Sequence, residues 1–246
     1  MVALSDRLDA ELADLRFAPP VTHVYRPLRY ARAPHAAYLQ RFGGLGAEAL
    51  LVGMNPGPWG MAQTGVPFGA VHRVRDWLGI DAPVEAPSDM HPKRPVEGFA
   101  CARREVSGDR LWGWAADVFG TPERFFRQFF VHNHCPLLFL EASGRNRTPD
   151  KLPRAERESL RDRCDQALRE VIEWTNVRWV IGVGQYAETR ARAAAEGLDG
   201  VRVGRILHPS PASPAANRGW AEQAHRQLCA LGLDLPSPGA AGETAS

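Results

Sequence analysis

The pattern of apolar and polar positions along the chain predicts four buried strands with helices between them. Mostly apolar runs cover residues 50–54, 129–133, 177–183 and 201–207. Stretches with apolar positions at helical spacing separate these runs, most clearly from Pro153 to Trp174. Parallel strands need long crossover connections, so this alternation predicts an α/β protein with a mainly parallel sheet covered by helices on both faces.

The other segments are predicted to pack around this sheet as one domain, residues 1–235. Ser5 is placed to cap an N-terminal helix that ends at Phe17, and an extended, proline-rich segment 18–34 follows. The prolines and missing periodicity of 81–104 predict a long surface excursion. Small residues, prolines and glycines predict a disordered tail at 236–246. Further helices are predicted for residues 38–45, 68–78, 109–119, 122–126, 184–196 and from Trp220 onwards.

Composition says more about the expected cellular compartment than about the expected binding partner. No apolar run is long enough to span a bilayer and the first residues do not form a signal sequence, so a cytoplasmic protein without a membrane partner is expected. The four cysteines include no CxxC pair and are expected to be free thiols. A formal charge of +2 does not by itself indicate nucleic acid. Only Lys93 and Lys151 are lysines among 30 basic residues, but a general bias towards arginine explains this equally well.

The longest irregular segment directly follows the first predicted strand. Residues 55–69, NPGPWGMAQTGVPFG, form a loop rich in proline and glycine. About 2 to 6 residues suffice to connect a strand to a helix, so this loop is long for a simple connection. Polar residues also follow two other strands, at Asn133 and at His208. Because open α/β sheets bind ligands at the carboxyl ends of their strands, we expect Asn55, Asn133 and His208 to converge on one crevice.

Three motifs together resemble the single-strand-selective monofunctional uracil-DNA glycosylases of the uracil-DNA glycosylase superfamily. They are GMNPGPWGMAQTGVPFG, FVHNHCPL and HPSPASPAANRGW, and the resemblance extends roughly from Leu50 to Trp220. It implies a three-layer α/β/α fold around a central, mainly parallel four-stranded sheet. It also implies an enzyme that flips uracil, 5-modified uracil or other deaminated bases out of DNA and hydrolyses the N-glycosidic bond. Such an enzyme is expected to act as a monomer on single- and double-stranded DNA, without a cofactor.

The resemblance also implies a role for individual residues. Asn55 takes the place of the residue that positions the attacking water, Asn133 that of the base reader, and His208 that of the leaving-group stabiliser. Ala212 stands where a basic residue often occurs in the family, so the sequence departs from the family pattern at this position. The implied base-binding residues are Gly57, Gly60, Met61, Phe68 and Asn133, and the implied DNA-binding residues are Ser210, Pro211, Ala212, Asn217, Arg218 and Gly219.

The chemistry of these side chains agrees with the implied roles. An amide offers uracil its NH₂ for O4 and its carbonyl for N3–H, and cytosine reverses both groups, so Asn133 discriminates only if its orientation is fixed. His208 is able to donate to the negative charge that develops on the departing base. Asn55 does not titrate, so it is expected to orient water instead of deprotonating it. No lysine lies in the three motifs, so a Schiff-base lyase step is not expected.

Two other classes of function remain open from the sequence, and one histidine pair needs separate comment. A nucleoside or nucleotide hydrolase would use the same crevice without needing the segment from Pro211 to Trp220. A non-catalytic single-stranded nucleic-acid-binding module would not need both Asn55 and His208. His132 and His134 form an HxH pair that metals use, although no Asp, Glu or Cys in the motif completes a tetrahedral set, and packing histidines are the more common explanation.

Overall fold

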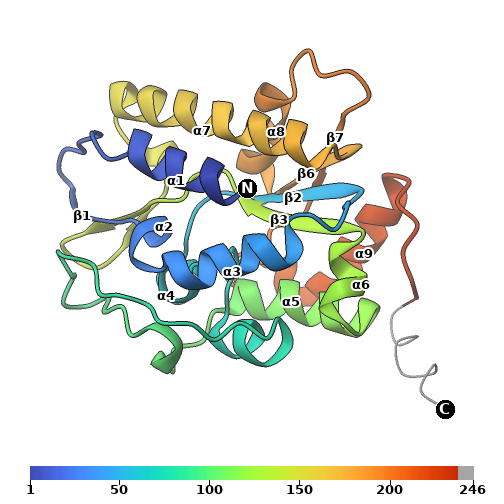
Figure 1. The fold of residues 1–246 in the computed structure, drawn as a ribbon, viewed down its shortest axis with the longest axis horizontal. Helices are drawn as coiled ribbons and strands as arrows, with labels where there is room; N and C mark the ends of the chain where they lie inside the picture. Colours follow the sequence, from blue (N-terminus) through green and yellow to red (C-terminus); the bar gives the residue numbers. More distant parts are fainter. Residues whose placement is uncertain (238–246) are drawn as a thin grey trace.

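The computed structural model describes residues 1–237, and its centre is a parallel four-stranded sheet (Figure 1). The strand order is β3-β2-β6-β7, with β2 at Ala49–Gly53, β3 at Phe129–Asn133, β6 at Trp179–Val183 and β7 at Arg202–Ile206. All five residues of β2 are buried, as expected for a strand covered on both faces. Gly53 pairs with Asn133, and Val183 pairs with Ile206, so neighbouring strands end at the same edge. The predicted fold class is confirmed.

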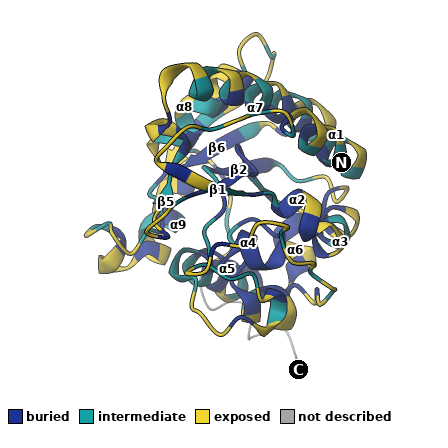
Figure 2. Cartoon of the chain, turned by 90° about the vertical axis from the view of Figure 1, so that its left-hand side faces the viewer, coloured by how far each residue is buried: buried dark blue, intermediate teal, exposed yellow. Residues whose placement is uncertain are grey.

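Helices cover this sheet on both faces and give three layers (Figure 2). One layer contains α1 (Val2–Glu11), α7 (Arg154–Thr175) and α8 (Gln185–Ala194). The opposite layer contains α3 (Arg32–Phe42), α5 (Val106–Phe119) and α6 (Pro122–Phe126). The second layer packs on β3 through a cluster of buried aromatic rings, so the sheet and α5 are held firmly together. This cluster includes Tyr38, Phe42, Trp112, Trp114, Phe125, Phe126, Phe129 and Phe130.

A second sheet, which the sequence pattern did not predict, lies beside the first. It consists of the antiparallel strands β1 (Val21–Tyr25), β4 (Leu138–Glu141) and β5 (Asn146–Arg147). One predicted segment was wrong: residues 18–34 are not simply extended, because they contain β1, the short helix α2 (Pro27–Tyr30) and the start of α3. The strand predicted at 129–133 is confirmed as β3, and the apolar run after Cys135 forms the separate strand β4.

Smaller differences concern helix ends. The N-terminal helix begins at Val2, so Ser5 is a buried residue inside it and not its cap. The helix predicted at 68–78 is mostly a π-helix, Arg73–Trp77. The tail predicted at 236–246 lies, from residue 238 onwards, outside the described residues. The remaining elements are α4 (Met61–Thr64), α9 (Trp220–Ala230) and the short 3₁₀ helices Gly98–Ala100, Pro149–Lys151 and Ala216–Arg218.

Two further findings concern the cysteines and the length of the helices. All four cysteines are free, as predicted, and three of them are buried. Within residues 1–237, no helix combines the length and the apolar character that crossing a membrane requires.

Candidate functional site

The ends of β2, β3 and β7 open into one cavity of about 410 Å³. The structure brings the two implied catalytic residues and all five implied base-binding residues together in its wall. We call it the base cavity. It is lined by Met54, Asn55, Gly57, Pro58, Gly60, Met61, Phe68, Glu105, Ser107, Asn133, Asn146, Thr148, His208 and Ser210.

Gly53, the last residue of β2, allows Asn133 and Phe68 to approach each other. A Cβ atom on Gly53 would collide with Oδ1 of Asn133 and lie 2.7 Å from Cε2 of Phe68. Phe68 has a φ of 54°, a left-handed conformation that costs a bulky residue of order 1–3 kcal/mol. The loop must therefore be held from outside, and the backbone of Gly108 in α5 packs directly against the carbonyl of Phe68.

The orientation of the Asn133 amide is fixed by Met61. The side-chain nitrogen of Asn133 donates to the Met61 sulfur at 3.2 Å, and both residues are buried. A thioether sulfur only accepts hydrogen bonds, so the NH₂ end and not the carbonyl end belongs on the Met61 side. One N–H of the NH₂ group and the carbonyl oxygen remain for a ligand. This supplies the fixed orientation that discrimination between uracil and cytosine requires.

His208 follows β7 and is held in one tautomer by the chain that comes after it. The backbone N–H of Ser210 donates to Nδ1 of His208 at 3.0 Å. A backbone N–H only donates, so Nδ1 must accept and the proton of the neutral ring resides on Nε2. Burial lowers the pKa of His208, so the ring is neutral at pH 7. His208 therefore keeps one N–H donor for a ligand without carrying a charge.

Asn55 is anchored through the nitrogen of its side-chain amide. Its side-chain nitrogen donates to the backbone carbonyl of Leu137 at 3.2 Å, which lies beyond the end of β3. The side-chain oxygen of Asn55 accepts no hydrogen bond from the described residues. An oxygen acceptor in the cavity wall suits a water molecule, because water donates to it and keeps a lone pair free.

Glu105 is a cavity residue that sequence reasoning missed. Its Oε1 accepts from the backbone N–H of Ser107 at 3.1 Å and caps α5. Its other oxygen lies against the loop, since a Cβ on Gly57 would come within 2.8 Å of Oε2. Burial raises the pKa of the Glu105 carboxyl. Glutamate is not a preferred cap residue and stands outside the three motifs, so the sequence contained no signal for it.

Glu105→Gln is expected to leave the protein at least as stable as the wild type at neutral pH. Because the pKa of Glu105 is raised in the folded state, its ionisation costs stability, and this cost grows as the pH rises above the ordinary range near 4.5. The glutamine oxygen still accepts from Ser107. Urea unfolding at pH 5 and pH 8 should therefore show a smaller loss of stability with rising pH for the variant. Glu222→Gln, on the surface of α9, is the control, and equal pH dependence in all three proteins would contradict the assignment.

The implied DNA-binding residues lie in one segment, 209–219, between β7 and α9. Arg110 of α5 holds this segment, because its Nη1 donates to the carbonyl of Pro209 at 3.0 Å and its Nη2 to Oδ1 of Asn217 at 2.8 Å. The nitrogen of Asn217 donates to the carbonyl of Pro211 at 3.0 Å. The Asn217 amide thus closes the segment on itself, whereas Arg218 is exposed. Sequence reasoning missed Arg110, which lies far from the motif that it supports.

The two histidines of the HxH pair, His132 and His134, lie in different surroundings. Nε2 of His134 lies 2.8 Å from Oδ1 of Asp165, which also pairs with Arg190. His132 lines a small inner cavity with His35, and burial lowers the pKa of His132 to about 3. Within residues 1–237, no group of three or more His, Cys, Asp or Glu side chains is arranged to hold a metal ion. His134 is thus held by Asp165, whereas His132 lines the inner cavity with His35.

Comparisons with known proteins agree with this geometry. The sequence profile of the uracil DNA glycosylase superfamily matches residues 40–230. Single-strand selective monofunctional uracil DNA glycosylases of Mus musculus and Rattus norvegicus are 53% and 54% identical over 228 residues, which is 92% of this chain and 82% of each relative. The protein of that name from Bos taurus is 52% identical over 228 residues, 92% of this chain and 84% of its own length. The crystal structure of wild-type Pedobacter heparinus SMUG2 shares the fold, with a TM-score of 0.64 at 17% identity over 93% of this chain and 98% of that one. Since the profile and the relatives span most of its length, the chain belongs to the uracil-DNA glycosylase superfamily.

Proposed function

We propose that this protein is a monofunctional uracil-DNA glycosylase, which flips uracil out of DNA and hydrolyses its N-glycosidic bond. One observation carries the proposal: three polar side chains at the ends of three different strands, Asn55, Asn133 and His208, line one cavity together with Phe68. The names of the mammalian relatives support the same activity. We include 5-modified uracil and other deaminated bases among the substrates, in single- and double-stranded DNA, and a monomer as the active form.

Base recognition depends on Asn133 and Phe68. A flipped uracil would offer O4 to the free N–H of Asn133 and N3–H to its carbonyl, while cytosine would meet two mismatched groups. Phe68 would stack on the ring, a contact worth about 1 to 3 kcal/mol per base. The Met61 sulfur prevents the Asn133 amide from turning to accommodate cytosine.

Bond cleavage depends on Asn55 and His208. The bond between the sugar and N1 breaks through an oxocarbenium-like state, with its electron pair leaving on the base. The neutral His208 ring donates its Nε2 proton as a hydrogen bond to O2, where the negative charge gathers. Asn55 orients the water whose oxygen bonds to the sugar carbon, and the proton that this water loses passes to solvent.

The reaction stops after base release. A lyase step needs an amine nucleophile for a Schiff base. The two lysines of the chain, Lys93 and Lys151, both lie in the described part and neither lines the base cavity. The product is therefore an intact abasic site.

Release of uracil from oligonucleotides under single-turnover conditions tests the proposal. Single- and double-stranded substrates with one uracil should be converted to abasic DNA, and matched cytosine substrates should remain uncut. Excess EDTA should not change the rate. Cleavage of free deoxyuridine at a rate that matches the oligonucleotide would favour a nucleoside hydrolase instead, and binding without release would favour a non-catalytic module.

A further inference from the structure

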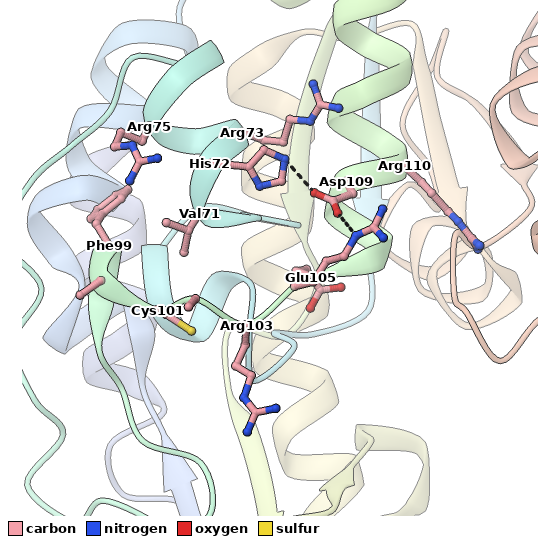
Figure 3. A pocket seen from close by; sticks show the side chains of 13 residues that line it. Val71, His72, Arg73, Arg75, Phe99, Cys101, Arg103, Glu105, Asp109 and Arg110 are labelled. Atoms are coloured by element: carbon pink, nitrogen blue, oxygen red, sulfur yellow. Dashed lines mark hydrogen bonds and ion pairs between the residues drawn. The ribbon is translucent and has the colours of Figure 1, made fainter.

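A second and larger cavity, of about 670 Å³, adjoins the base cavity (Figure 3). Its walls are residues 71–75, the segment 99–105 and the first turn of α5, where Asp109 and Arg110 lie. We call it the arginine pocket, because cationic side chains dominate its charge. Arg73, Arg75, Arg103, Arg104, Arg110 and His72 line it, against only two carboxylates, Glu105 and Asp109.

Asp109 joins two walls of the arginine pocket, and Arg104 balances its charge. Its Oδ2 lies 2.6 Å from Nε of Arg104, and its Oδ1 lies 3.1 Å from Nε2 of His72 (Figure 3). Arg75 pairs with its neighbour Asp76 at 2.8 Å. Asp109 and Asp76 are thus already paired with arginines that they contact. The pocket retains an excess of positive charge, which comes from the remaining arginines.

Three of these arginines, Arg73, Arg103 and Arg110, have no carboxylate partner among the described residues, and Arg110 already holds the segment 209–217. Nε of Arg73 is buried and makes no hydrogen bond within the described structure. No described carboxylate balances the charge of the Arg73 guanidinium, which lines the pocket. Arg103 lies over the ring of Trp59 with its guanidinium carbon 5.5 Å from the ring centroid, which leaves its N–H groups available. Both side chains are suited to an anion.

The arginine pocket lies where its positive charge would be close to a DNA strand bound at the base cavity. Glu105 lines both the arginine pocket and the base cavity. Arg110 lines the arginine pocket and holds the segment 209–217. That segment, PSPASPAAN, contains no charged side chain of its own. A strand whose base enters the base cavity must place its neighbouring phosphates close to this junction, where the arginines are the main source of positive charge.

We propose that the arginine pocket binds backbone phosphates of the DNA strand next to the flipped nucleotide, with Arg73 and Arg103 as ligands. Guanidinium groups fork onto phosphate oxygens, and phosphate contacts fix the register of a strand without reading its sequence. The inference rests on the proposed function, since it places the same DNA substrate. A free phosphate or a mononucleotide offers the same oxygens, so the test must distinguish these sources.

The double variant Arg73→Gln with Arg103→Gln tests the proposal. The probe is an oligonucleotide with one 2′-fluoro-2′-deoxyuridine, which resists hydrolysis, bound over a range of salt concentrations. Affinity should fall roughly tenfold or more, as expected when charge-assisted hydrogen bonds are lost. The slope of log affinity against log salt should shrink by about 1.4 for single strands, at about 0.7 for each phosphate contact.

The matched control is Arg124→Gln with Arg127→Gln. Both residues are exposed, lie in or just after α6 and precede β3, at the edge of the sheet opposite the base cavity. The control removes the same charge, so it should keep the affinity and the salt slope of the wild type. Urea unfolding of both double variants checks that they remain folded.

Single methylphosphonate linkages locate the contact. Replacing a phosphate that the pocket binds should weaken the wild type but should not weaken the Arg73 and Arg103 double variant any further. Full displacement of the oligonucleotide by inorganic phosphate or by deoxyuridine monophosphate at millimolar concentration would identify a small anion as the ligand and overturn the proposal. Unchanged affinity and salt slope in the double variant would also overturn it. Failure of the wild type to release uracil would instead refute the proposed function.

Discussion

His208→Ala is expected to slow single-turnover uracil release by about 10² to 10³-fold, while affinity for the uracil oligonucleotide stays nearly unchanged. The variant loses a donor whose position and tautomer are already set by the Ser210 backbone, so no reorganisation is needed when charge develops on the base. Because the donor acts mainly on the departing base, its removal should affect the rate and not the binding step. Rate and affinity should be measured on the same oligonucleotide.

The pH profile separates this role from a purely structural one. Burial lowers the pKa of His208 below its ordinary value of 6.5, so the ring is mostly neutral at pH 7 and above, and the wild-type rate should be flat from pH 7 to 8. Below the lowered pKa, Nδ1 gains a proton and can no longer accept from Ser210, so the rate should change only in that acidic range. A variant that retained the wild-type rate, or that lost only affinity, would contradict the assignment.

Gly53→Ala is expected to reduce uracil release by about 10²-fold or more. The new Cβ would collide with Oδ1 of Asn133 and lie 2.7 Å from Cε2 of Phe68, so the two residues that we propose to hold the base would have to move. A displacement of about 1 Å at a reacting centre is enough for a loss of this size. Overpacking should also cost roughly 1 to 3 kcal/mol of stability, so rates must be measured well below the unfolding midpoint.

Gly44→Ala is the matched control for this substitution. A Cβ at Gly44 meets no atom within 4 Å, so the control should retain both rate and stability. Equal rates in the two alanine variants would mean that Asn133 and Phe68 need not hold their present positions during the reaction.

The central sheet was predictable because its signal is local. A strand buried on both faces must be apolar at every position, and β2 shows this within five residues. The second sheet was not predictable in this way. Its pairing of His23 with Leu140 joins segments that lie far apart in the chain, and neither segment has a pattern that reports its partner. The helix predicted at 68–78 buries Val74, but its π-type hydrogen bonding could not be deduced from spacing.

The base cavity also has a part that was predictable from the sequence and a part that was not. Asn55, Asn133 and His208 were predictable as a group, because parallel strands end at one edge and each residue follows such a strand. Their supporting contacts were not predictable. Arg110 acts from α5 on backbone carbonyls, which any sequence would provide, and Met61 controls the Asn133 amide through a weak sulfur acceptor. The sequence identifies side chains with suitable chemistry, whereas the contacts that orient them depend on the folded chain.

At Phe68, the left-handed backbone brings selection for stability into conflict with selection for activity. Glycine or asparagine adopts this conformation at lower cost, so selection for thermal stability alone would favour either residue at this position. Neither has an aromatic ring to stack on a flipped base. A laboratory lineage evolved for heat resistance without a repair assay should therefore tend to lose Phe68, and its gain in stability would be accompanied by loss of activity.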